Sequence, residues 1–238
     1  MAKKRSASPL KAIIIKSASE LFFENGFSKT TPKDVCQKAD VGTGNLTYYF
    51  PTKEHMLATL VQMMIDFQWK EMEAQTDEGA SSLLAYCLEL TTLVAISEEF
   101  LQMQDFLFAA YTHSMTLSLI QANDVEKIKR VFADYTYGWD EEMFIETETL
   151  ISGIEYASLV HTESIASTPK RIEGALNTIL SMFDIPRDVR KAKIEKVLSM
   201  DYRAIGRKVY EGFKKYVTDT NEHALEEILK STKIRTYK

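Results

Sequence analysis

The sequence predicts an all-α fold. Only nine glycines and five prolines interrupt 238 residues, and so few breakers favour long helices over strands joined by turns. Apolar residues recur at intervals of three and four along most of the chain, which is the period of a helix with one buried face. With 45% hydrophobic and 26% charged residues, the chain has the composition of a soluble protein and the length for one large or two modest domains.

The N-terminal part predicts two helices separated by a short loop. The apolar spacing indicates a first helix over Leu10–Asn25, and Gly26 follows at the point where a helix end favours a left-handed residue. Thr31 can cap a second helix, and Pro32 suits its first position because the missing N–H has no partner there. This second helix is expected to end at about Ala39.

A tight turn leads from the second helix into a third. Asp40–Gly42 forms the turn, Thr43 is expected to cap the third helix, and Pro51 ends it because the residue before proline avoids the helical conformation. Thr52 then caps a long helix from Lys53 to about Thr76. Two short helices joined by a tight turn are typical of a helix-turn-helix, whose second helix enters the major groove of DNA.

The helical pattern continues after Gly79 without a convincing strand, internal repeat or low-complexity segment. The expected helices span Ser81–Ile96, Glu98–Thr112, Ser114–Gln121, Asp124–Tyr137, Asp140–Ser164, Pro169–Phe183, Pro186–Val217 and Asn221–Ser231. We therefore expect a three-helix helix-turn-helix DNA-binding domain over residues 1–53 and a larger helical domain over residues 54–238.

Charge is divided unevenly along the chain. Residues 1–53 hold nine Lys/Arg against four Asp/Glu, or +5; residues 54–185 hold six against twenty-two, or −16; residues 186–238 hold fourteen against eight, or +6. A basic N-terminal domain suits contact with phosphates, and an acidic body is repelled from the duplex, which helps to orient that domain. The basic residues after Pro186 have several possible partners: DNA, another protein or the acidic middle of the chain. The alternative that we favour is a solvated helix face without such a partner.

The N-terminal domain resembles the TetR family of bacterial transcription regulators. The resemblance runs without a gap from Ile14 to Leu57, about a fifth of the chain, and includes Gly26-Phe27, Thr30-Thr31, Val41-Gly42, Tyr49-Phe50 and Lys53-Glu54. It implies that the third helix reads the major groove, with Asn45 contacting a base edge and Tyr49 and Lys53 anchoring phosphates. The DNA-binding residues expected on this basis are Thr31, Lys33, Gly42, Thr43, Gly44, Asn45, Thr47, Tyr48, Tyr49 and Lys53.

Two positions in the third helix depart from the family pattern. Thr43 stands where a lysine is common, and Thr47 stands where a tyrosine is common, so the operator sequence does not transfer from the family. Tyr48 either contacts DNA or packs on the following helix. The basic arm Lys3–Arg5 either enters the minor groove or, as we favour, attracts phosphate without order.

The resemblance also implies that the body binds a small-molecule inducer and forms a homodimer. Large apolar side chains with a few polar groups suit an apolar or amphipathic ligand, although the same residues can simply form the core. The ligand-binding residues expected are Phe67, Phe106, Tyr111, His113, Tyr135 and Trp139. Dimerisation is expected through Asp140–Ser164 and Lys170–Phe183, with Ile151, Ile154, Ser158, Gly153 and Ala157 in the first helix; a two-fold dimer then requires a near-palindromic operator.

The sequence offers no support for an enzyme. The four histidines are scattered, and no metal-binding, nucleotide-binding or nucleophile motif occurs, so neither a catalytic residue nor a cofactor is expected. No apolar run reaches 18 residues, which argues against a membrane partner, and the two isolated cysteines, Cys36 and Cys87, suit the reducing cytoplasm. The sequence therefore favours a ligand-responsive repressor bound to double-stranded DNA; an architectural or protein-tethering DNA-binding protein without an inducer is the alternative.

Overall fold

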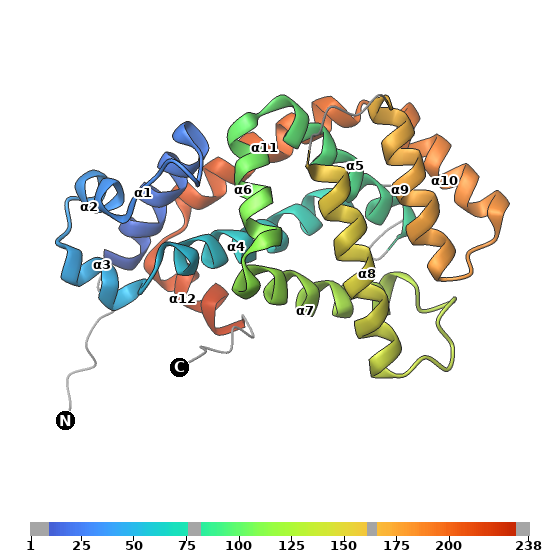
Figure 1. Cartoon of the computed structure of the whole chain (residues 1–238), viewed down its shortest axis with the longest axis horizontal. Coiled ribbons are helices and arrows are strands. Elements are labelled where there is room, and N and C mark those ends of the chain that lie inside the picture. The colour runs from blue at the N-terminus through green and yellow to red at the C-terminus, as the bar shows by residue number, and fades with distance from the viewer. Residues whose placement is uncertain (1–9, 76–81, 161–165, 232–238) are drawn as a thin grey trace.

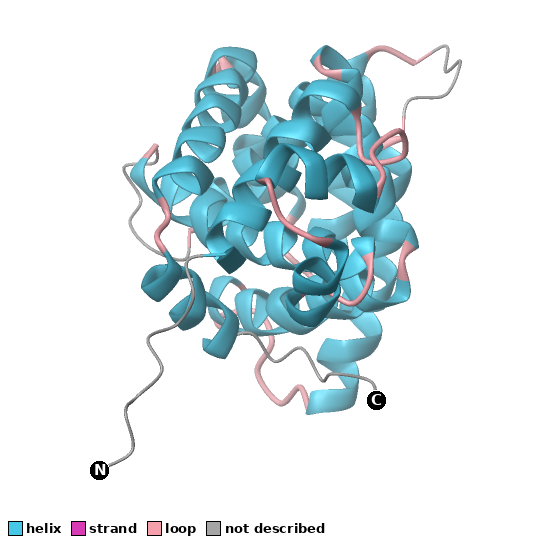
Figure 2. Cartoon of the chain, turned by 90° about the vertical axis from the view of Figure 1, so that its left-hand side faces the viewer, coloured by secondary structure: helices cyan, strands magenta, loops and turns pink. Residues whose placement is uncertain are grey.

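Every regular element of the computed structural model is a helix over the residues that it describes, 10–75, 82–160 and 166–231 (Figure 2). The helices are α1 (Leu10–Asn25), α2 (Pro32–Ala39), α3 (Thr43–Tyr49), α4 (Lys53–Ala74), α5 (Leu83–Glu99), α6 (Leu101–Thr112), α7 (Ser114–Val131), α8 (Glu141–Leu159), α9 (Thr168–Met182), α10 (Arg187–Ser199), α11 (Tyr202–Asp219) and α12 (Glu222–Ser231). The all-α prediction is confirmed. Across the described ranges, no helix combines the length and apolar character needed to cross a membrane.

The three short N-terminal helices lie together at one end of the molecule, and α4 leads from them into the body (Figure 1). Helix α5 occupies the middle of the body, where it packs against α4, α6, α8, α9, α10 and α11. Its sequence is apolar on every side, and all its residues from Leu84 to Ser97 are buried. A helix without a polar face is stable only when neighbours surround it, which accounts for its central position.

The N-terminal helices also pack against the body. In α1, the ring of Phe23 lies 5.6 Å from that of Phe106 in α6 and 5.8 Å from those of Tyr210 and Phe213 in α11, between centroids. Helix α12 returns to the same end, where Glu222 accepts a 2.6 Å hydrogen bond from the backbone N–H of Ala12. The first helix is therefore held by helices from the end of the chain.

The structure corrects the prediction in two long segments. The residues expected to separate Ser114–Gln121 from Asp124–Tyr137 continue a single helix, α7. Its Asn123 amide donates to the carbonyl of Leu119 and to Gln62 of α4, so a residue that often ends helices is satisfied inside one. Conversely, the helix expected over Pro186–Val217 is broken, because the Asp201 side chain accepts from the Ala204 N–H at 3.0 Å and caps a new helix, α11.

Smaller corrections concern helix ends. Gly42, and not Thr43, is the N-cap of α3, and no side chain caps that helix. The hydroxyl of Thr52 lies 3.0 Å from Nδ1 of His55, a side-chain partner in the first turn of α4. The cap predicted at Thr31 is confirmed, and Asp140, the expected start of its helix, caps α8.

Candidate functional site: an exposed helix face and a buried charged core

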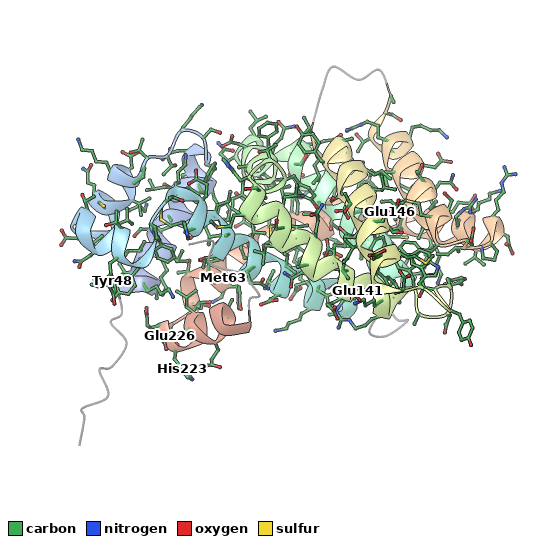
Figure 3. All side chains as sticks on the ribbon, turned by 60° about the horizontal axis from the view of Figure 1, so that its bottom comes forward. Tyr48, Met63, Glu141, Glu146, His223 and Glu226 are labelled. Atoms are coloured by element: carbon green, nitrogen blue, oxygen red, sulfur yellow. The ribbon has the colours of Figure 1, made fainter. Side chains whose placement is uncertain are left out.

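Helix α3 presents a polar face to solvent. Leu46 and Phe50, at 1% and 3% exposure, hold the helix on the core, while Gly42, Thr43, Gly44, Asn45, Thr47 and Tyr48 are exposed. Tyr48 is 80% exposed and lies at the outer end of the molecule (Figure 3). The side chains expected to read DNA therefore lie together on one accessible surface.

The hydroxyl of Thr47 is already used inside α3. It donates to the carbonyl of Thr43 at 3.0 Å, a bond that short polar side chains often make one turn back along a helix. Tyr49 differs from its neighbour Tyr48 because it is half-buried against the core. The two rings meet edge to face, with their centroids 5.0 Å apart.

Helix α2 begins with a reciprocal cap. Thr31 accepts from the backbone N–H of Asp34, and Asp34 accepts from both the backbone and the hydroxyl of Thr31. The hydrogen bond from the Thr31 hydroxyl has the largest effect on Asp34, followed by the one from the Thr31 backbone N–H. Both lower the pKa of the Asp34 carboxyl. Lys33 beside this cap is exposed, so it is a cation available to a phosphate.

Lys53 has partners within the protein. Its ammonium donates to the carbonyls of Phe27 at 2.9 Å and Thr30 at 3.1 Å and lies 4.0 Å from the centre of the Phe27 ring. Partial burial lowers the pKa of the ammonium. These contacts tie the start of α4 to the loop between α1 and α2, a structural role beyond the expected phosphate anchor. The arm Lys3–Arg5 lies outside the described residues.

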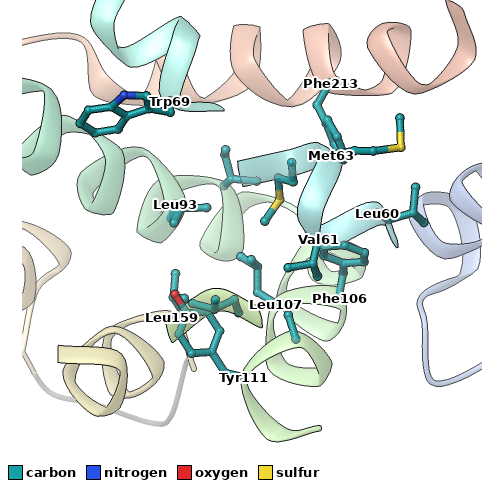
Figure 4. Packing of buried hydrophobic residues seen from close by; sticks show 14 of the residues in the cluster. Leu60, Val61, Met63, Trp69, Leu93, Phe106, Leu107, Tyr111, Leu159 and Phe213 are labelled. Carbon is teal, nitrogen blue, oxygen red and sulfur yellow. The ribbon is translucent and has the colours of Figure 1, made fainter. Parts of the chain in front are cut away.

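The six residues expected to bind a ligand are dispersed. Only Tyr111 lines the central cavity of about 30 Å³, which is bounded by α4, α5, α6, α7 and α8; Figure 4 shows Tyr111 with Val61 and Leu107 in this core. Phe67 stacks on Tyr216, Trp139 stacks on Phe183, and Phe106 packs on Phe23. His113 contacts the edge of Phe27, and Tyr135 packs on the core.

A lysine surrounded by acidic residues lies beside this cavity. The Lys127 ammonium is 2.7 Å from Oδ1 of Asp124 and 3.0 and 2.9 Å from the two oxygens of Glu89. Burial alone would lower the pKa of Lys127, but the charges of Asp124 and Glu89 outweigh that effect and raise it. Burial raises the pKa of Glu89, and the charge of Lys127 opposes that increase.

Two further acids complete this buried charged core. Glu155 accepts a 2.9 Å hydrogen bond from the hydroxyl of Tyr111, and burial, followed by the charge of Asp124, raises its pKa to about 8. The same two causes raise the pKa of Glu148 well above its usual value. Both oxygens of Glu148 are buried without a hydrogen-bond partner.

Most of this buried charged core was not predicted from the sequence. Glu89 stands out as an acid among apolar residues, but Asp124 and Lys127 read as an ordinary surface pair one turn apart. Glu148 and Glu155 are seven residues apart, a spacing that places them on one side of a helix. That spacing becomes informative only once the side of α8 that faces the core is known.

One contact joins the body directly to the loop after α1. Asp105 of α6 accepts hydrogen bonds from the backbone N–H of Ser28, at 2.8 Å, and from its hydroxyl. Gly26 in this loop has φ +97°, and a Cβ there would lie 2.8 Å from an Asp105 oxygen. The same helix contributes Leu107, Ala110 and Tyr111 to the central cavity.

Helices α8 and α9 leave a solvent-exposed surface, here called the α8–α9 face. On α8 it includes Leu150, Gly153 and Ala157, and on α9 it includes Gly174 and Thr178. No atom comes within 4 Å of a Cβ built on either glycine. Of the residues expected in a dimer contact, Ile151 and Ser158 instead point into the protein, where they are buried.

The basic C-terminal part of the chain pairs with the acidic middle. Arg203 pairs with Glu98, which also pairs with Arg171 of the middle segment, and Arg207 lies 3.0 Å from Glu99. These ion pairs join α9 and α11 to the end of α5. The contact with the acidic middle is therefore confirmed for Arg207, where we favoured a solvated face.

Comparison with known proteins identifies the N-terminal helices. Residues 14–60 match the family model described as bacterial regulatory proteins, tetR family. QacR, a transcriptional regulator of Staphylococcus aureus, is 24% identical over 160 residues, which cover 66% of this chain and 82% of QacR. YuxN, an uncharacterised regulator of Bacillus subtilis, is 27% identical over 95 residues, which are 40% of this chain and 32% of YuxN.

A solved structure extends the likeness in fold to the body. FadR of Thermus thermophilus, a TetR-family repressor crystallised with lauroyl-CoA, has a TM-score of 0.53 and 18% identity, with 74% of this chain and 96% of FadR covered. The similarity in fold therefore includes the helical body as well as the N-terminal helices. The family-model match over residues 14–60, the related regulators and the likeness in fold together support a regulator of the TetR family.

Proposed function

We propose that the chain is a ligand-responsive repressor that binds a near-palindromic operator as a homodimer. Its DNA-binding domain spans residues 1–53 and its ligand-binding and dimerisation domain residues 54–238. The observation that carries the proposal is the exposed polar face of α3, held in place by buried Leu46 and Phe50. An α-helix fits the major groove, and side chains near its N-terminus reach the base edges.

Within this surface the residues have different roles. Asn45 is exposed in the first turn, and its amide can both donate to and accept from an adenine. Tyr48, Thr31 and Lys33 contact the backbone and set the register of the helix, together with the N–H groups of Gly42, Thr43 and Gly44. Thr47 offers a methyl group to a thymine while its hydroxyl stays bonded within the helix. Tyr49 and Lys53 lie behind this surface and support it. Each also contacts a phosphate through polar atoms that are not hydrogen-bonded within the protein.

The α8–α9 face is the proposed dimer contact. Leu150 of α8 is 56% exposed, and a second copy packed on this face would bury it. Gly153 and Gly174 allow the backbones of two helices to approach closely. Pairing of these helices with their symmetry mates places two copies of α3 in one assembly, as a palindromic site requires.

Helix α6 is the proposed link between ligand and DNA. It lines the central cavity with Tyr111 and holds the loop after α1 through Asp105. A ligand that moves α6 therefore acts on the position of the DNA-binding helices without touching them. QacR is a transcriptional regulator, and FadR is a TetR-family repressor whose structure contains lauroyl-CoA, which supports a ligand-binding role for the body here.

The size of the cavity favours a second candidate function. About 30 Å³ holds one or two water molecules, whereas drug-sized ligands occupy pockets of roughly 300–1,000 Å³. An architectural DNA-binding protein without an organic inducer fits this closed core. A thermal-shift screen separates the two, because an inducer at one hundred times its Kd stabilises the protein by about 2.7 kcal/mol; no response across a chemically diverse set supports the architectural function.

The DNA-binding proposal is tested by selecting genomic fragments with the purified protein and measuring affinity for the enriched site. Tyr48→Ala is expected to weaken that affinity at least about tenfold, which corresponds to roughly 1.4 kcal/mol of binding free energy. Tyr137→Ala is the matched control, because Tyr137 is 99% exposed in the loop before α8. Equal affinity of both variants and the unmodified protein would contradict the assignment of α3 to DNA.

A further inference from the structure

Three carboxylates from two helices meet inside the body. One oxygen from each of Asp124 on α7, Glu148 on α8 and Glu155 on α8 lies within 4.8 Å of the other two. All three residues are buried, with Glu148 only 1% exposed. Asp124 and Glu155 also line the small central cavity. No element of the proposed operator binding requires this arrangement.

The charges of this core do not balance. Four carboxylates, those of Glu89, Asp124, Glu148 and Glu155, face the single ammonium of Lys127, so the fully ionised cluster carries four negative charges against one positive, a net −3. An unpaired buried ion costs several kcal/mol even after the protein relaxes. The cluster therefore needs either protons or another cation.

Glu148 lacks a donor that would stabilise its charge. Neither of its oxygens has a hydrogen-bond partner within the described structure, and a buried polar group without a partner costs roughly 1–3 kcal/mol. A protonated Glu148 would itself be a donor and would have to use the neighbouring carboxylates of Asp124 or Glu155 as acceptors. A cation neutralises the cluster without adding another donor that needs an acceptor.

The spacing suits a metal ion better. Two oxygens on opposite sides of an ion are separated by twice the metal–oxygen distance, about 4.0–4.2 Å for Mg²⁺ and about 4.6–5.2 Å for Ca²⁺. The three carboxylate oxygens lie within 4.8 Å of one another, which is inside the separation that Ca²⁺ allows. A cavity of about 30 Å³ has room for a metal ion or for a water molecule that binds it. It is too small for an organic cation.

The neighbouring groups hold the acids in position. The Tyr111 hydroxyl donates to Oε2 of Glu155, and Lys127 holds Asp124 and Glu89. With Lys127 retained, a divalent ion changes the net charge of the ionised cluster from −3 to −1. All the donors are oxygens, the ligand type preferred by Mg²⁺, Mn²⁺ and Ca²⁺ over Zn²⁺ or copper.

We propose that Asp124, Glu148 and Glu155 bind one divalent cation of the oxygen-preferring class and so join α7 to α8 inside the body. The ion is a further ligand of this protein, independent of its operator. Because α8 also carries the α8–α9 face, the bound ion stabilises the helix that is proposed to form the dimer.

The test is direct metal binding to the full chain after treatment with a chelator. Mn²⁺ is titrated by electron paramagnetic resonance, which measures the free ion, and Mg²⁺ and Ca²⁺ are added in competition. The expected result is one saturable site per chain and a rise in melting temperature with the preferred metal. Glu148→Gln is expected to weaken Mn²⁺ binding at least about tenfold and to remove the metal-dependent rise.

Glu146→Gln is the matched control, because Glu146 is exposed on the same helix (Figure 3) and its variant should bind Mn²⁺ as the unmodified protein does. Asp124→Asn provides a second variant, and circular dichroism reports whether each variant folds. Absence of a saturable site, or equal Mn²⁺ binding by Glu148→Gln and the unmodified chain, would overturn the proposal whether or not the protein binds an operator.

Discussion

Replacing Lys53 by methionine separates two roles for this residue. Methionine keeps most of the apolar stem and removes the ammonium, which bonds to the carbonyls of Phe27 and Thr30 and lies over the Phe27 ring. Phe27 and Thr30 are themselves buried, at 3% and 2% exposure, so water replaces these bonds poorly. A structural role predicts a loss of folding stability in this variant, whereas a phosphate-binding role predicts a loss of affinity for DNA.

The expected loss follows from the interactions of the ammonium. Hydrogen bonds from a charged donor contribute roughly 1.5–3 kcal/mol each when buried, and a cation over an aromatic ring adds about 0.5–1 kcal/mol at an exposed site. Since Lys53 is only partly buried, we expect a total loss of about 2–4 kcal/mol in the free energy of unfolding. With a urea m-value of about 2 kcal/mol/M, this lowers the unfolding midpoint by about 1–2 M.

Urea unfolding and the salt dependence of DNA binding together test this reasoning. Lys33→Met is the matched control, because Lys33 is an exposed cation in the first turn of α2. It should leave the midpoint unchanged and reduce the slope of log affinity against log salt by about 0.9 for each phosphate that the side chain no longer neutralises. If Lys53→Met instead preserves the midpoint and reduces that slope, the structural role assigned to Lys53 is refuted.

Three further predictions concern the body. Leu150→Glu should convert the proposed dimer to monomers in sedimentation velocity, because a charge is buried in the α8–α9 face; Tyr137→Glu, in an exposed loop, should leave the mass unchanged. Phe132→Ala should lower the free energy of unfolding by about 3–5 kcal/mol, since the fully buried ring stacks on Phe183 at 3.7 Å; a loss below about 1 kcal/mol would contradict this packing. Partial burial favours the neutral form of Glu98, but hydrogen bonds from Thr168 and Arg203 outweigh it and lower the pKa below the unfolded value of 4.5. Its stabilisation is therefore present above pH 4.5 and is lost as the pH falls through the folded pKa, so Glu98→Gln should be less stable than the unmodified protein at neutral pH and converge with it in acid.

Local chemistry explains which helix ends were predictable. Thr31 and Asp140 cap helices because each side chain accepts a backbone N–H three residues later, and this pattern is legible in sequence. Asn123 reads as a break, but its amide finds Gln62 on α4, a residue 61 positions away. Whether such a residue ends a helix depends on tertiary partners that sequence alone does not show.

The same limit applies to the functional residues. The exposed face of α3 was predictable because a helix-turn-helix has short, fixed spacing. The ligand-binding prediction rested on aromatic residues, which are equally good core residues, and only Tyr111 reached the cavity. Glu148 and Glu155 were not predicted because α8 has apolar residues on several sides, so its sequence does not show which side is buried.

The position of α5 has a consequence for synthesis of the protein. This helix is complete at Glu99, but its neighbours include α11, which ends at Asp219, 120 residues later. At about 5–20 residues per second, the ribosome needs roughly 6–24 s to supply that cover. Throughout that interval the apolar sides of α5 lack their final partners, and a chain truncated before α11 is expected to aggregate or to be held by chaperones.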